Sequence, residues 1–129
     1  MPAPTSPTYS VAALVAAHTS FRDLIDGGSG PGKIRIRSAT DVLLAEVILT
    51  DPCGTVNGTT GQLTFAIATQ EDAAVAGTAA YGEFCDSANV VHLALPCEAG
   101  TTAVSGKLVL NSLLLAGGGP VEIISAVIG

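Results

Sequence analysis

The stretch KIRIR, residues 33–37, is where the hydrophobic period of this sequence changes from helical to extended. Ile34 and Ile36 alternate with three cations, Lys33, Arg35 and Arg37. A period of two is typical of a strand with one buried face and one solvated face. The stretch therefore predicts a strand that presents its three cations on one face.

Upstream of this strand, residues 11–25 predict an amphipathic helix. Its apolar positions recur at spacings of three and four, and Ala-rich filling over residues 12–17 favours helix. The residues of the apolar stripe are Val11, Leu14, Val15, His18, Phe21, Leu24 and Ile25. Gly27-Gly28 follows directly, and we expect it to end the helix in the left-handed conformation.

Downstream of residue 37, short apolar segments alternate with Gly and Pro turns. Turns are predicted at 51–54, at Asn57-Gly58 and at 117–120. The expected strands are 42–49, 62–69, 77–85, 90–95, 107–113 and 121–128. This spacing indicates an all-β protein, an antiparallel β-sandwich or barrel (jelly-roll-like) with one N-terminal α-helix.

The length of 129 residues is that of one domain, which we place at residues 11–129. Residues 1–10 contain Pro2, Pro4 and Pro7, which prevent a regular helix. We expect these residues to form an extended arm that can lie along a neighbouring protein.

The composition excludes several classes of function. The net charge is −6 and only five residues are Lys or Arg, which argues against nucleic-acid binding. No apolar run approaches the ~18 residues that span a bilayer, and no basic segment of a secretory signal is present. We therefore expect assembly in the cytoplasm and no membrane partner. A charged content of only 12% and a core of small aliphatic residues favour association with other protein surfaces.

No catalytic, metal or cofactor-binding residue is predicted. Residues 27–33 fit the start of a phosphate-binding loop, but such a loop follows a strand and precedes a helix, and here the order is reversed. His18 and His92 have no His or Cys at ligand spacing, so packed or hydrogen-bonded roles are expected. No local nucleophile signature is present. Asn57-Gly58-Thr59 has the spacing of a glycosylation site, but it fits a tight turn better.

One cluster of charge remains, the basic stripe of Lys33, Arg35 and Arg37. It has two interpretations. The stripe is a solvated strand face paired with nearby carboxylates such as Asp41 or Glu46, or it is a docking surface for an acidic protein partner. The odd number of Cys leaves three readings open: buried free thiols, one internal disulfide, or a bond to another subunit. The cysteines are Cys53, Cys85 and Cys97.

Residues 21–36, FRDLIDGGSGPGKIRI, resemble a family of small proteins of tailed phages and prophages. In that family a helix leads through a Leu-Ile-Asp-x-Gly-Ser-Gly-like loop into an alternating strand. Residues 43–54, 76–81 and 85–87 are similar to later parts of the same family, as is the closing apolar strand. The resemblance covers most of the chain from residue 18. Tyr81 and Phe84 stand where family members often carry Trp or another large residue.

The resemblance implies a non-catalytic virion protein. The expected role is a capsid decoration or cement protein that self-associates into a small homo-oligomer and binds the major capsid protein on the outside of the head. A tail, neck or baseplate component is the alternative, and a secreted adhesin or carbohydrate-binding module is a second one. The sequence motifs do not separate head from tail, because both surfaces are built from symmetric protein contacts.

Overall fold

The structure, a computed structural model, describes residues 3, 8–69 and 73–129. The predicted helix is confirmed as α1 (Val11–Ile25). Ser10 caps its first turn, where the hydroxyl accepts a hydrogen bond from the Ala13 N–H at 3.1 Å. Pro2, Pro4 and Pro7 of the predicted arm lie outside the described residues.

The helix ends differently from the prediction. Its last residue is followed by Asp26 in the right-handed conformation, and the Asp26 N–H donates to the Arg22 carbonyl. Neither Gly27 nor Gly28 has a positive φ, so the expected left-handed cap was wrong. The right-handed Asp26 continues the helical hydrogen bonding by one residue and makes a left-handed glycine unnecessary.

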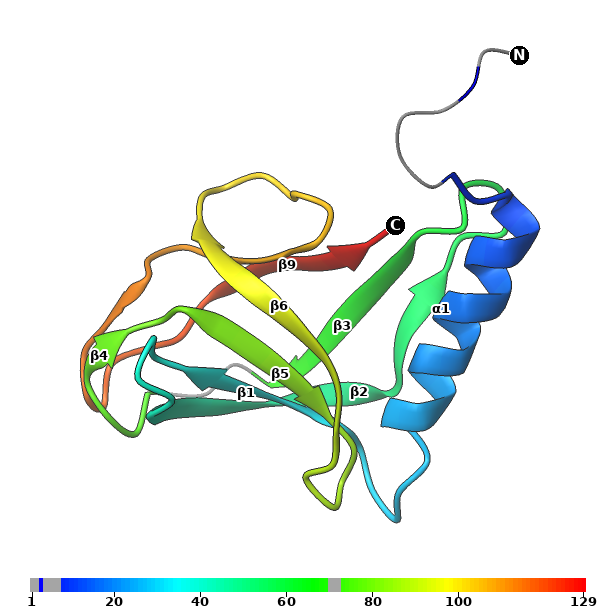
Figure 1. Ribbon diagram of the computed structural model, residues 1–129. Coiled ribbons are helices and arrows are strands. Elements are labelled where there is room, and N and C mark those ends of the chain that lie inside the picture. The colour runs from blue at the N-terminus through cyan, green and yellow to red at the C-terminus, as the bar shows by residue number, and fades with distance from the viewer. Residues whose placement is uncertain (1–2, 4–7, 70–72) are drawn as a thin grey trace.

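The described residues form nine strands, and seven of them close into a barrel in the order β1-β2-β3-β9-β7-β6-β5 (Figure 1). The other two, β4 and β8, form a separate two-stranded sheet. All-β with one N-terminal helix is confirmed, and the barrel is the architecture found. The strands are β1 (Lys33–Arg37), β2 (Leu43–Val56), β3 (Leu63–Thr69), β4 (Gly77–Thr78), β5 (Tyr81–Cys85), β6 (Val91–Ala99), β7 (Lys107–Leu110), β8 (Leu114–Leu115) and β9 (Ile123–Ile128).

Strand pairing is antiparallel except between β6 and β7, which run parallel with Cys97 opposite Leu108. A parallel pair needs a longer connection than a hairpin. Here residues 100–106 supply it as a loop that leads from the end of β6 to the start of β7.

The predicted turn at Asp51–Gly54 was wrong, because this segment lies within β2. Leu49 of β2 pairs with Ile67 of β3, and the next pair in the register is Gly54 with Phe65. The β2 segment between these pairs is longer than the β3 segment, so its extra residues form a bulge. Pro52 is exposed there and has no N–H to donate, which a bulge tolerates.

Three other predicted boundaries moved. Segment 77–85 divides into β4 and β5, and segment 107–113 stops at Leu110 before β8 begins. Strand β6 continues past Pro96, since the Cys97 N–H donates to the Ala80 carbonyl and keeps the chain extended. These changes follow from pairing partners far along the chain, which local patterns do not specify.

The helix α1 lies at one end of the barrel, against β2 and β6 (Figure 1). Ile25 is completely buried in the core and Phe21 packs against it. The two aromatic rings among the buried core residues, Phe65 and Phe84, have centroids 4.5 Å apart and are tilted by 42°. The remaining core is aliphatic, as the composition indicated.

Candidate docking surface

The basic stripe lies on β1, which is hydrogen-bonded to β2 on one side and to β5 on the other. Lys33, Arg35 and Arg37 are partly buried, whereas Ile34 and Ile36 are fully buried in the core. The predicted alternation of a charged face and a buried face is therefore confirmed.

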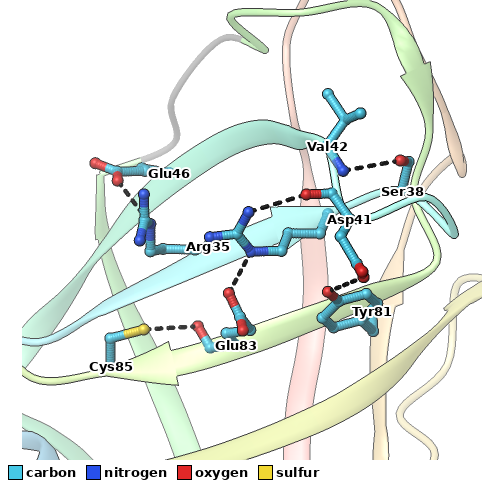
Figure 2. Close-up of polar contacts among 9 residues, drawn as sticks. Arg35, Ser38, Asp41, Val42, Glu46, Tyr81, Glu83 and Cys85 are labelled. Atoms are coloured by element: carbon cyan, nitrogen blue, oxygen red, sulfur yellow. Dashed lines mark hydrogen bonds and ion pairs between the residues drawn. The ribbon is translucent and has the colours of Figure 1, made fainter. Parts of the chain in front are cut away.

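Arg35 stands opposite a carboxylate on each neighbouring strand, Glu46 on β2 and Glu83 on β5. Its Nε lies 3.0 Å from Glu46 Oε2 (Figure 2). The N–H does not meet hydrogen-bond geometry with that oxygen, so this contact is an ion pair without a hydrogen bond. Such a half-exposed pair stabilises a protein by roughly 0–1 kcal/mol.

Arg37 makes the stronger contacts of the stripe. Its Nε donates to Glu83 Oε1, and its Nη1 donates to the Asp41 carbonyl at 3.1 Å. The hydrogen bond that Arg37 donates to Glu83 raises the pKa of the Arg37 guanidinium. Both side chains are about 20% exposed, so solvent screens this pair less than the one at Arg35.

The Asp41 carboxylate pairs with neither Arg. It accepts a hydrogen bond of 2.6 Å from the Tyr81 hydroxyl, and this bond raises the pKa of Tyr81 (Figure 2). Of the two acids named from the sequence as partners of the stripe, Glu46 is confirmed. Asp41 contributes its backbone carbonyl instead, because its side chain is directed across to β5.

Lys33 makes no ion pair within the described part of the chain, unlike the two Arg residues. In register it lies opposite Ile48 on β2 and Cys85 on β5, neither of which is charged. Among the three cations of the stripe, Lys33 is thus the one without an ion pair in the described part of the chain. The positive charges of Arg35 and Arg37 are largely neutralised by Glu46 and Glu83.

Two hairpin turns of the same construction hold this face in place. In the β1–β2 turn the Ser38 hydroxyl accepts hydrogen bonds from two backbone N–H groups, and in the β5–β6 turn Asp86 Oδ1 does the same. The residue with positive φ is Asp41 in the first turn and Asn89 in the second. Asp and Asn adopt this conformation at the lowest cost after Gly.

The glycine-rich segment 27–32 connects α1 to β1, in the order helix, loop, strand that the sequence indicated. Its glycines allow close packing. A Cβ on Gly28 would lie 1.8 Å from Ser87 Oγ, and one on Gly32 would lie 2.3 Å from Ile25 Cγ2. The loop therefore packs against the β5–β6 turn and the end of the helix.

Both histidines are engaged in the fold, as the sequence predicted. His18 is buried, and its Nδ1 donates to the Gly61 carbonyl. His92 Nε2 lies 3.1 Å from Asp86 Oδ2. Backbone hydrogen bonds from Val90, then the contact with His92, lower the pKa of Asp86. No group of three metal-binding side chains occurs among residues 3, 8–69 and 73–129.

All three cysteines are free thiols. Cys53 and Cys85 are buried and Cys97 is partly exposed. Burial raises the pKa of Cys53 and of Cys97 to about 12, and it also raises that of Cys85. The structure thus has no internal disulfide among these three cysteines, and a bond to another subunit stays a prediction.

Sequence reasoning missed Glu83 and Tyr81 as members of this surface. Glu83 is 46 residues from Arg37 in the chain, so no local pattern connects them. The available signal was the alternation Tyr81, Glu83, Cys85, which would place the three on one face of a strand.

Comparisons with known proteins give no match: no family model, no curated protein and no solved structure resembles this chain. Within the described residues, no helix is both long and apolar enough to cross a bilayer.

Proposed function

We propose that this protein is a non-catalytic structural component of a tailed-phage virion, a decoration or cement protein that binds the outer surface of the head. It self-associates into a small homo-oligomer and contacts the major capsid protein. In this role it braces the assembled shell.

The observation that carries the structural role is the exposure of large apolar side chains. Tyr9, Leu24, Val90 and Leu114 are each more than half exposed, at 68%, 51%, 52% and 74%. Apolar exposure of this kind, on a chain with only 12% charged residues, favours contact with other proteins. The phage assignment is supported by the sequence resemblance of residues 21–36.

The basic stripe on β1 offers a way for this protein to recognise its binding partner. Arg35 and Arg37 have carboxylate partners already, so a docking protein gains little by displacing them. Lys33 has none in the described part of the chain, and its register partner on β5, Cys85, lies in turn opposite the exposed Val91 on β6. A single cation at the rim of an interface sets orientation and association rate more than affinity.

The test is co-sedimentation of the purified protein with expanded heads, and separately with tails, of the phage that encodes it. Low and high salt are compared. The variants are Lys33→Glu and, as a matched control, Lys107→Glu, the other lysine of the chain. We expect saturable binding to heads, which Lys33→Glu weakens and Lys107→Glu leaves unchanged.

Binding to tails alone would transfer the protein to the tail, neck or baseplate. Binding to neither would reject the virion role. Equal effects of the two lysine variants would show that Lys33 is not part of the contact. They would not contradict the decoration role.

A further inference from the structure

The loop between β2 and β3, residues 57–62, lies beside the first half of α1 (Figure 1). Its first four residues, from Asn57 to Thr60, are exposed. The Thr59 N–H and the Thr60 N–H donate to Asn57 Oδ1, at 2.8 and 3.1 Å. The side-chain amide of Asn57 is therefore fixed against the backbone that follows it, and it remains open to water.

The backbone nitrogen next to this amide in the chain belongs to Gly58. Its N–H donates no hydrogen bond within the described residues, although the N–H groups of Asn57, Thr59, Thr60 and Gly61 all do. Gly58 has no side chain, and a Cβ built there meets no heavy atom within 4 Å. The Gly58 nitrogen is therefore accessible to base, and no hydrogen bond has to break before it reacts.

An amide side chain followed by such a nitrogen can cyclise. Base removes the Gly58 N–H proton, and the nitrogen attacks Asn57 Cγ to form a new C–N bond. The Cγ–Nδ2 bond then breaks, and Nδ2 takes a proton from water and leaves as ammonia. Water opens the resulting cyclic imide at either carbonyl, which gives aspartate or isoaspartate. The net reaction consumes water, releases ammonia and adds a negative charge to the chain.

The two threonine N–H groups lie where this reaction develops charge. During the attack, negative charge collects on Asn57 Oδ1, the atom that already accepts both hydrogen bonds. Donors fixed at such an oxygen stabilise a tetrahedral intermediate, as in an oxyanion hole. Attack within one chain also needs no encounter between two molecules. The turn thus combines a nucleophile free of hydrogen bonds with donors for the intermediate.

From this geometry we propose that Asn57 is a site of spontaneous deamidation, and that the folded turn promotes the reaction. The proposal is independent of the virion role. Its chemistry requires only water and base, and its products are aspartate and isoaspartate at position 57.

The other two asparagines of the chain, Asn89 and Asn111, lack this combination. Asn89 is followed by Val90, which has a branched side chain and whose N–H donates to Asp86 Oδ1 at 3.0 Å. Asn111 is followed by Ser112, and its side-chain oxygen accepts no hydrogen bond in the part of the chain that the structure describes. Both serve as internal controls.

Isoaspartate at position 57 disturbs the attachment of α1. The Gly61 N–H donates to the Asn57 backbone carbonyl at 2.7 Å, and in isoaspartate that carbonyl becomes a carboxylate outside the main chain. Gly61 also accepts a hydrogen bond from His18 Nδ1, and a Cβ on it would lie 2.5 Å from Leu14 Cβ. A displacement of Gly61 therefore acts directly on two residues of α1, and we expect the modified chain to hold the helix less tightly.

The test is peptide mapping by mass spectrometry of the full chain, aged at neutral and at mildly alkaline pH. We expect modification at Asn57 first, and faster at the higher pH because the attacking nitrogen must lose its proton. Gly58→Ala is the matched variant, since its Cβ has open space and Asn57 is kept. It should slow the reaction roughly tenfold or more, because a side chain on the attacking residue hinders ring closure.

Ageing in urea separates the role of the turn from the general reactivity of an Asn-Gly pair. We expect Asn57 to react at least as fast in the folded chain as in urea, because only folding places the two threonine N–H groups. Asn89 should react more slowly in the folded chain. The proposal would be overturned by modification of Asn57 in urea alone, by an unchanged rate in Gly58→Ala, or by equal modification of all three asparagines.

Hydrogen exchange measures the consequence for α1. The modified chains carry an added negative charge, so anion exchange separates them from the unmodified chains. In the isoaspartate fraction, the amides of α1 should exchange faster than in the unmodified chain, and those of β5 should not. Asn57→Asp gives the aspartate product with a backbone of normal length, and should leave α1 protected. Unchanged exchange in the isoaspartate fraction would overturn the link between this site and the helix.

Discussion

The carboxylate of Asp26, directly after α1, accepts hydrogen bonds with both oxygens from the backbone N–H of Cys53, at 2.9 and 3.1 Å. These bonds join the end of the helix to the bulge in β2. The Cys53 thiol adds a longer contact of 3.8 Å to the Arg22 carbonyl. Because Cys53 is completely buried, its N–H has no access to water if Asp26 is removed.

Asp26→Ala should therefore lower the free energy of unfolding by about 1–3 kcal/mol, the cost of leaving a buried donor without a partner. Asp26→Asn keeps an acceptor oxygen and should cost less. Urea denaturation measures both, and Asp23→Asn on the exposed side of α1 is the control, with an expected change within about 0.5 kcal/mol. A harmless Asp26→Ala would show that the contact contributes nothing.

The same pair predicts a pH dependence. Burial raises the pKa of Asp26 above 3.8, against the lowering effect of the Cys53 N–H. A raised pKa in the folded state means that this group's stabilising contribution is present below 3.8 and is lost as pH rises through the folded pKa. Asp26→Asn cannot ionise, so its stability relative to wild type should improve from acid to neutral pH. Denaturation at several pH values checks the sign, and the opposite trend would contradict the burial argument.

The two ion pairs of the stripe should differ in strength. A double-mutant cycle of Arg37→Met and Glu83→Gln should give a coupling energy of about 1 kcal/mol or more, since both groups are largely buried and hydrogen-bonded. The cycle of Arg35→Met and Glu46→Gln should give roughly 0–1 kcal/mol, and added salt should reduce it further. Equal coupling in the two cycles would show that the missing hydrogen bond at Arg35 is unimportant.

Ala substitutions at three glycines distinguish the cost of backbone strain from the cost of steric contact. Gly61 has a φ of +76°, and a Cβ there would lie 2.5 Å from Leu14 Cβ. Gly118 has a φ of +78° with open space, and Gly58 has neither constraint. Substitution by Ala should be near neutral at Gly58, cost about 1–2 kcal/mol at Gly118, and cost more at Gly61. Thermal unfolding of the three variants gives the order, and any other order would contradict the assignment.

Thiol chemistry gives the last prediction. Burial holds the pKa of Cys53 and Cys97 at about 12, so few thiolates form at pH 8 and the folded protein should react slowly with Ellman's reagent. Cys97, which is partly exposed, should react first. In denaturant without reductant, all three thiols should react. A count of one free thiol in denaturant would indicate a disulfide.

Much of the fold was determined by local sequence. The spacing of apolar residues determined α1, because a helix must bury one stripe. The alternation in KIRIR determined β1, because successive strand residues face opposite sides. The tight turn at Asn57 also follows from a local rule, since its side chain accepts hydrogen bonds from Thr59 and Thr60.

Only the tertiary structure decided which groups meet. Glu83 reaches Arg37, and Asp41 reaches Tyr81, because closure of the barrel places β5 beside β1. That register depends on contacts between residues 40 or more positions apart. The pairing of β2 with β3 also made residues 51–54 a bulge. Local patterns report which face of a strand is apolar, but the neighbour of each strand is chosen by packing of the whole core.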